Sequence, residues 1–121
     1  MQELPAGGGM RGRMNIYDYW TTVQKKDMDA LRNCFISNAC IRTHNTKEQL
    51  TVEEFLDAAG RESMQWEGEL ERVEEVGSLI IVVSRIHMEN GRRSFHAVSF
   101  IHFMHEKIAS IDRYVGEDSV T

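Results

Sequence analysis

The sequence is poor in cysteine and proline, its basic residues are fewer than its acidic ones, and it has no long apolar run. Among 121 residues only Cys34 and Cys40 are cysteines, and Pro5 is the one proline. Two thiols without a Cys-x-x-Cys spacing are too few for a zinc site. A disulfide is not expected either, because a helix end followed by a strand would turn the two side chains apart. We therefore predict two small core residues, and neither a metal nor a cofactor.

The charge balance argues against a nucleic-acid binder. The chain carries 14 Lys and Arg against 19 Asp and Glu, a net charge of -5. Its basic residues form scattered pairs, such as Lys25 with Lys26, rather than a patch. No stretch approaches the roughly 18 apolar residues of a membrane span, and no early segment resembles a secretory signal. We expect no nucleic-acid partner, no membrane partner and a cytoplasmic location.

The composition that remains is that of an ordinary globular domain. Hydrophobic residues make up 41% and charged residues 27% of the chain, close to the globular average. A chain of this length buries roughly two-thirds of its unfolded surface, which is enough for a core. Residues 1–13, with Pro5 and three consecutive glycines, are interpreted as a flexible tail. Residues 14–116 then form one domain, and 117–121 a short C-terminal tail.

The first half of the domain has helical patterning. Asn15 is a suitable N-cap for a helix over 16–26, whose apolar residues recur at i, i+3, i+4 and i+7 from Ile16. Asp27 is expected to cap a second helix over 28–35, and 39–44 to form a short strand. Thr51 and Glu54 have the spacing of a capping box, which predicts a third helix over 52–62.

The second half has the period of strands. Polar and apolar residues alternate from Trp66 to Glu74, and 79–88 is rich in β-branched residues. Asn90-Gly91 is the strongest hairpin signal of the chain; strands over 92–103 and 107–115 follow. Helices followed by a four-strand antiparallel meander predict an α+β fold.

Three stretches are similar to the nuclear transport factor 2-like superfamily, and in particular to its SnoaL-like branch. WTTVQKKDMDALRNCF (Trp20–Phe35) resembles the opening helices, IRTHNTKEQLTVEEF (Ile41–Phe55) the first strand and third helix, and Ser94–Gly116 the closing hairpin. This resemblance covers 14–116. It implies the ketosteroid isomerase-like fold, a cone-shaped α+β barrel with a curved antiparallel sheet around three helices. Because this fold hosts isomerases, cyclases, dehydratases and binding domains, it does not decide the function.

The closing hairpin also departs from the pattern of the branch. Arg113 and Val115 stand where relatives usually carry Glu and Trp, and the turn at His105-Glu106 lacks the usual Gly. The mouth of the expected pocket therefore differs in size and charge. An Arg at this position favours an anionic or carbonyl-bearing ligand through charge-assisted hydrogen bonds.

The resemblance further implies positions for catalytic groups. In ketosteroid isomerase a carboxylate moves a proton while a Tyr and a protonated Asp stabilise the enolate oxygen. The order of motifs places the Tyr at Tyr19, the base at Thr43 and the second donor at Ser99. A threonine is no general base near neutral pH, so this set is incomplete. His44 is the candidate substitute, because imidazole titrates near neutral pH; strand alternation instead predicts that it is structural or lies at the rim.

Strand parity sorts the residues of 94–103. By the resemblance, Phe95, Ala97 and Ser99 face the pocket, whereas the opposite face is the one through which relatives commonly dimerise. We therefore predict a homodimer, since an exposed apolar patch favours a partner. The expected interface residues are His96, Val98, Phe100 and His102.

Two functions remain open from the sequence. The first is binding of a small, mostly apolar molecule without catalysis, favoured because no inward carboxylate is evident. The second is a small-molecule isomerase, cyclase or dehydratase that uses His44, or another polar group, as acid and base. Arg85 and His87 share one strand face; they either bind a ligand or are solvated at an edge. The expected pocket residues are Tyr19, Trp20, Thr43, Asn45, Phe55, Trp66, Arg85, His87, Phe95, Ser99 and Arg113.

Overall fold

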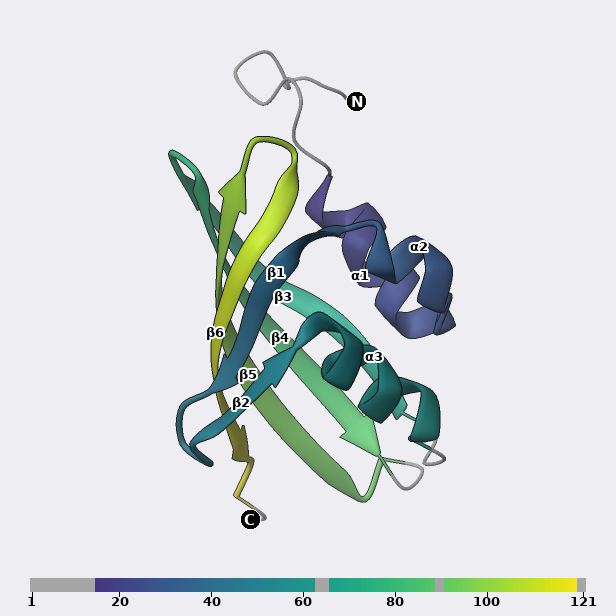
Figure 1. Cartoon of the computed structure of the whole chain (residues 1–121). Helices are drawn as coiled ribbons and strands as arrows, with labels where there is room; N and C mark the ends of the chain where they lie inside the picture. Colours follow the sequence, from purple (N-terminus) through teal and green to yellow (C-terminus); the bar gives the residue numbers. More distant parts are fainter. Residues whose placement is uncertain (1–14, 63–65, 89–90, 120–121) are drawn as a thin grey trace.

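A curved sheet with helices on one side is the architecture of the domain (Figure 1). The computed structural model describes residues 15–62, 66–88 and 91–119, so the expected tail over 1–13 lies outside the described residues. The elements are α1 (Ile16–Lys25), α2 (Met28–Arg32), β1 (Phe35–Thr43), β2 (Glu48–Thr51), α3 (Val52–Arg61), β3 (Trp66–Val76), β4 (Leu79–Met88), β5 (Arg93–Met104) and β6 (Lys107–Glu117).

The predicted helix caps are present. The Asn15 side chain accepts a hydrogen bond from the amide of Tyr17, and Asp27 accepts one from Ala30. Thr51 and Glu54 form both hydrogen bonds of the capping box. These contacts satisfy amides that have no partner inside the helix, so each helix begins where the sequence predicts.

The order of strands in the sheet is β2-β1-β6-β5-β4-β3. The last four strands are antiparallel neighbours, which confirms the predicted meander. Gly91 has a φ of 86°, the left-handed conformation that the predicted turn needs; Asn90 lies outside the described residues. The α+β fold class is confirmed, with a sheet that is curved but not closed.

The start of β1 differs from the prediction. Helix α2 ends at Arg32 instead of residue 35, and β1 begins at Phe35 instead of residue 39. Phe35 is buried in contact with the rings of Tyr19 and Phe55, at centroid distances of 6.2 and 5.8 Å. A buried Phe35 is equally compatible with the predicted helix and with a strand. The strand forms because the amide of Ile108 donates to the carbonyl of Cys34 and aligns β1 on β6. Tertiary pairing, which is not local, therefore decides the boundary.

The sheet is mixed rather than antiparallel throughout. Strand β1 pairs with β6 in parallel, across a connection that includes β2, α3 and the other strands, long enough for a parallel pair. Strand β2 was not predicted; it has four residues and pairs antiparallel with β1. Strand β6 continues to Glu117, and the amide of Asp118 donates to the carbonyl of Ser94. The expected tail over 117–121 thus belongs in part to the sheet.

The core lies between the helices and the inner face of the sheet. Cys34 packs against it, and Cys40 lies beside the Arg42 guanidinium; both thiols are free. The most deeply buried side chains are Leu31, Ile41, Ile80, Ile101 and Ile108.

The outer face of β1 and β6 carries a compact ionic cluster. Arg42 donates from Nε and Nη2 to both carboxylate oxygens of Asp112, at 2.6 and 3.1 Å. The Nε2 atom of His44 lies 2.7 Å from Asp112 Oδ1. Hydrogen bonding to Arg42 and then to His44 lowers the pKa of Asp112 from 3.8 to about 2.

We predict that this carboxylate stabilises the fold in a pH-dependent way. A group whose pKa is lowered by folding contributes fully above its unfolded pKa, and the contribution disappears as the pH falls through the folded one. Asp112→Asn should therefore lower the free energy of unfolding by about 1 to 2 kcal/mol at pH 7. The difference should shrink from pH 5 to pH 2.5 in urea titrations.

The matched control is Asp57→Asn, which removes an exposed pair with Arg61. A surface pair of this kind contributes about 0.3 to 0.5 kcal/mol. A loss at Asp112 that is the same at every pH would contradict the prediction.

Candidate functional site

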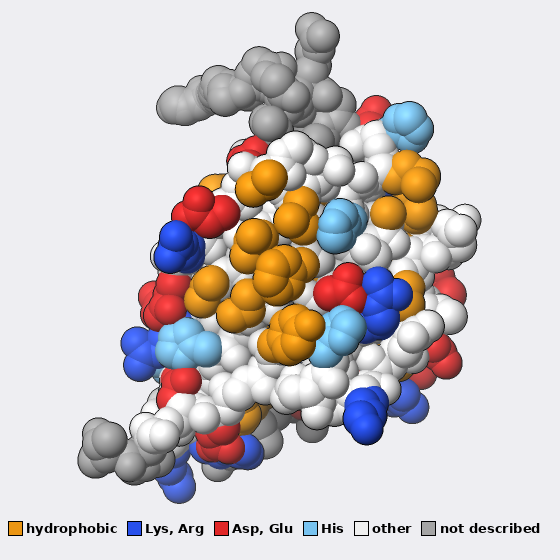
Figure 2. Space-filling model, turned by 90° about the vertical axis from the view of Figure 1, so that its left-hand side faces the viewer, with side chains coloured by type: hydrophobic (Ala, Val, Ile, Leu, Met, Phe, Trp, Pro, Cys, Tyr) orange, Lys and Arg blue, Asp and Glu red, His pale blue; other side chains and the backbone are white. Residues whose placement is uncertain are grey.

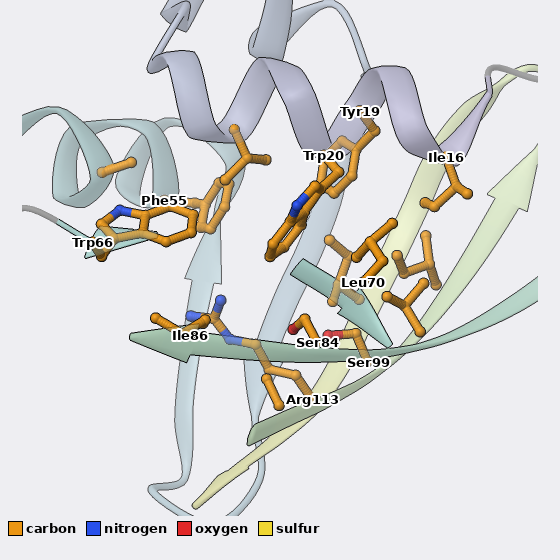
Figure 3. A pocket seen from close by; sticks show the side chains of 16 residues that line it. Ile16, Tyr19, Trp20, Phe55, Trp66, Leu70, Ser84, Ile86, Ser99 and Arg113 are labelled. Carbon is orange, nitrogen blue, oxygen red and sulfur yellow. The ribbon is translucent and has the colours of Figure 1, made fainter. Parts of the chain in front are cut away.

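A cavity of about 190 Å³ lies under α1, between the helices and the inner face of the sheet (Figure 3). Its wall is mostly apolar, and four aromatic side chains contribute to it from α1, α3 and β3. The lining residues are Ile16, Tyr19, Trp20, Val23, Phe55, Ala59, Trp66, Leu70, Val82, Ser84, Ile86, Ala97, Ser99, Ile101, Ile111 and Arg113.

Arg113 is the charged residue of the cavity. In the parallel ladder it is the partner of Thr43, and its Nε donates to Thr43 Oγ1 at 2.7 Å. The guanidinium carbon lies 5.8 Å from the centre of the Phe55 ring. No carboxylate in 15–62, 66–88 or 91–119 forms an ion pair with Arg113. The cavity thus holds a positioned cation, and none of the described residues that line it carries an opposite charge.

Two serine hydroxyls lie on the floor of the cavity. Ser84 on β4 and Ser99 on β5 both line it, and Figure 3 shows them close together near the stem of Arg113. Ser84 is only 4% exposed. Within the described residues its hydroxyl has no side-chain hydrogen bond, and a buried polar group without a partner is costly. A ligand atom or a water can satisfy it.

Tyr19 is buried at the α1 side of the cavity. Burial raises the pKa of its phenol well above the ordinary value of 10.0, while the nearby charge of Arg113 acts in the opposite direction. Its hydroxyl has no hydrogen-bond partner among the described residues. Tyr19 is therefore a neutral donor at physiological pH.

Two indoles close the space between α1 and β3. The rings of Trp20 and Trp66 meet edge to face, with centroids 5.9 Å apart. A Cβ added at Gly68 would lie 2.7 Å from Trp20 Cζ2 and 2.9 Å from Trp66 Cζ3, so both rings rest on this glycine. Gln24 Nε2 donates to the Gly68 carbonyl at 2.7 Å and holds α1 to β3.

The structure places seven of the predicted site residues in or beside the cavity. Tyr19, Trp20, Phe55, Trp66, Ser99 and Arg113 line it, and Thr43 anchors Arg113. The sequence analysis missed Ser84 and Gly68. A glycine inside a strand pattern is a signal of close approach by another group, and it could have identified Gly68.

His44 does not lie in the cavity. Thr43 faces inward and is 6% exposed, so the next side chain points to the outer face. There the His44 ring contacts Asp112 and stacks on Tyr114, with centroids 5.0 Å apart. Asn45 is also outside: its amide donates to the Val115 carbonyl and accepts from the Val115 amide, which ties the turn after β1 to β6.

Arg85 and His87 also lie on the outer face. The residues of β4 that line the cavity are Val82, Ser84 and Ile86, which have the opposite parity. Arg85 aligns with His96, and the His87 ring lies 3.9 Å from Glu69. Phe95 shares the inner parity of Ala97 but is not among the cavity residues; the Arg93 guanidinium covers its ring at 5.0 Å.

Two other kinds of site were sought in the described residues. No group of three or more His, Cys, Asp or Glu side chains there could hold a metal ion. No helix there is both long and apolar enough to cross a membrane.

Comparison with known proteins identifies the fold. No family model and no curated protein matches the chain. An NTF-2 like protein of unknown function from Burkholderia xenovorans superposes with a TM-score of 0.75 at 16% identity, covering 88% of this chain and 83% of that one. The chain has the nuclear transport factor 2-like fold.

Two further solved structures are similar to this domain. A SnoaL-like protein from Shewanella putrefaciens has a TM-score of 0.72 at 12% identity, covering 83% of this chain and 85% of that one. An LEH-like epoxide hydrolase from M. tuberculosis has a TM-score of 0.71 at 10% identity, covering 84% and 79%. At these identities the likeness establishes the fold alone.

The buried phenol predicts a distinct alkaline behaviour. Since folding raises the pKa of Tyr19, the unfolded state binds fewer protons above about pH 10, and stability falls there as the pH rises. Tyr19→Phe should leave stability at pH 7 nearly unchanged. It should make the decline between pH 10 and 11.5 shallower by up to about 1.4 kcal/mol per pH unit. Urea denaturation at several alkaline pH values measures both slopes, and equal slopes would refute the prediction.

Proposed function

We propose that this domain binds a small, mostly apolar molecule whose anionic or carbonyl group faces Arg113. The observation that carries the proposal is the guanidinium without an ion-pair partner among the described residues, in a largely apolar cavity. Because Nε is already bonded to Thr43, the terminal nitrogens are left to donate to a ligand oxygen. Charge-assisted hydrogen bonds of this kind are stronger than neutral ones, and they orient an otherwise apolar ligand.

Binding without proton transfer is the favoured form of this function. The described residues that line the cavity include no carboxylate and no imidazole, and His44 and His87 lie on the outer face. A general base must be within hydrogen-bond reach of the proton that it removes. The alternative, an isomerase, cyclase or dehydratase, would have to rely on Tyr19, which burial keeps neutral.

The ligand proposal predicts selectivity for acids over amides. A panel of small carboxylic acids and their neutral amides should be screened by thermal shift. An acid at about 100 times its Kd should stabilise the domain by roughly 2.7 kcal/mol, which raises Tm by several degrees, and its amide should give a smaller shift. Arg113→Met should abolish the advantage of the acids.

Arg85→Met is the matched control, since it removes an arginine of the same sheet, on β4, from the outer face. It should retain the shift produced by acids. Equal shifts for acids and amides, or the same loss in both variants, would contradict the role of Arg113.

We also propose that a second copy of the chain covers the outer face of the sheet. Figure 2 shows hydrophobic side chains gathered on this face and charged ones around them. We define the outer apolar patch as Ile81, Val83, Val98, Phe100 and Tyr114, which lie side by side in the ladders of β4, β5 and β6. An apolar centre with a polar rim is typical of a self-complementary two-fold interface.

Charge on the rim supports one arrangement of the two copies. Three acidic residues, Glu69, Glu71 and Glu74, outnumber Arg72 on the β3 side of the patch. On the β1 side Arg42 balances Asp112, and His44 lies beside them. A two-fold axis parallel to β5 brings β3 of one copy over β1 of the other. An axis across the strands would instead place acidic β3 against itself, which like-charge repulsion disfavours.

The predicted interface histidines belong to the rim of this face. His96 lies between Asp118 and Glu71, at 2.6 and 3.0 Å, and the hydrogen bond to Asp118 raises the pKa of its ring. His102 is exposed at the other end of β5. The centre of the proposed contact is therefore Val98 and Phe100.

The dimer proposal predicts the effect of a charge in the patch. Phe100→Lys should give a monomer at micromolar concentration, because an interface core does not accept an unpaired charge. Tyr17→Lys, at an exposed position on α1, is the control and should remain a dimer. Sedimentation velocity measures both, and a wild-type monomer at high concentration would overturn the proposal.

A further inference from the structure

We infer that Trp20 and Trp66, held on Gly68, restrict the ligand to a single ring, so that its class is the monocyclic aromatic acids. This inference rests on the proposed function, since it adds a limit of size and shape to the acid that Arg113 would bind. It depends on the volume of the cavity, on the chemistry of its walls and on the contact of both indoles with Gly68.

The volume sets the scale. An engineered apolar cavity of about 150 Å³ in another protein holds benzene, whereas pockets for drug-sized ligands begin near about 300 Å³. The cavity here, of about 190 Å³, lies between these values. At the packing density of protein interiors, about 0.74, it holds about 140 Å³ of ligand atoms. One six-membered ring with a small substituent fits with room to spare, whereas a second fused ring fills the whole volume.

The walls specify an aromatic ring with one polar end. Tyr19, Phe55 and the two indoles surround the apolar part, and aromatic pairs gain energy beyond that of buried area. Arg113 occupies one wall, with its guanidinium over Phe55. The buried, unpartnered hydroxyl of Ser84 adds a polar point on the floor, suited to an oxygen next to the acid group.

The indoles set the limit because neither can approach the β3 backbone more closely. Their ring carbons lie 2.7 and 2.9 Å from where a Cβ of residue 68 would be, so glycine is required for this arrangement. The two rings also support each other edge to face, and Gln24 holds α1 to the same glycine. Removing one indole lengthens the cavity toward the space between α1 and β3.

The experiment compares benzoate with 2-naphthoate by calorimetry and by intrinsic fluorescence. Trp20 and Trp66 are the two tryptophans of the chain, so a ligand between them changes the emission directly. Wild type should bind benzoate at least tenfold more tightly than 2-naphthoate. Trp66→Ala should lower the ratio of benzoate affinity to 2-naphthoate affinity at least tenfold. Trp66→Phe, which retains a ring, should keep the preference for benzoate.

Gly68→Ala provides a second variant that retains both indoles. It should weaken benzoate binding at least fivefold and alter the emission spectrum, because the new methyl group displaces the rings. Equal affinity of wild type for both acids, or a ratio that none of these variants changes, would overturn the size limit while the proposed function stands. Binding of neither acid to wild type or to any variant would overturn the aromatic class, and the proposed function itself falls only if no acid of the thermal-shift panel binds either.

Discussion

The parallel register of β1 on β6 determines what each face of this domain can do. It pairs Thr43 with Arg113 and Arg42 with Asp112, and the amide of His44 donates to the carbonyl of Arg113 at 2.9 Å. The first pair lies inside and positions the cation of the cavity; the second lies outside and forms the ionic cluster. Because β5 fixes the register of β6, a slip of β1 by one residue would turn Arg42 inward and Thr43 outward, and Arg113 would lose its anchor. Cavity and outer surface therefore depend on the same ladder.

Local signals were sufficient for the helices and the meander, because their causes are local. Asn15, Asp27 and Thr51 cap their helices through residues two or three positions away. The parallel pair and β2 could not be predicted in this way. Both depend on segments that are distant in sequence or that lack alternation, and Phe35 is compatible with a helix or a strand until β6 is present.

The candidate site was predictable wherever one face of an element is clearly marked. Helical spacing identified Tyr19 and Trp20, and the resemblance assigned the inner face of β5 with Ser99. The sequence of β4, LIIVVSRIHM, does not reveal which face is the inner one, because apolar residues occupy both faces. The charges of Arg85 and His87 suggested chemistry, yet these residues lie outside, and the small Ser84 lies on the cavity floor. Only the pairing with both neighbouring strands decides the parity of such a strand.

The separation of charged groups between the two faces bears on the kind of chemistry that the cavity supports. His44, His96 and their carboxylate partners Asp112 and Asp118 are outside, whereas the cavity holds a guanidinium, a neutral phenol and hydroxyls. None of these groups exchanges a proton near neutral pH; the phenol stays protonated because burial raises its pKa. What they do supply is a fixed positive charge in an apolar enclosure, where an opposite charge is attracted more strongly than in water. Under the proposal made above, an acid bound beside Arg113 would supply a counter-charge that the described lining residues lack, so ligand binding would also neutralise the interior.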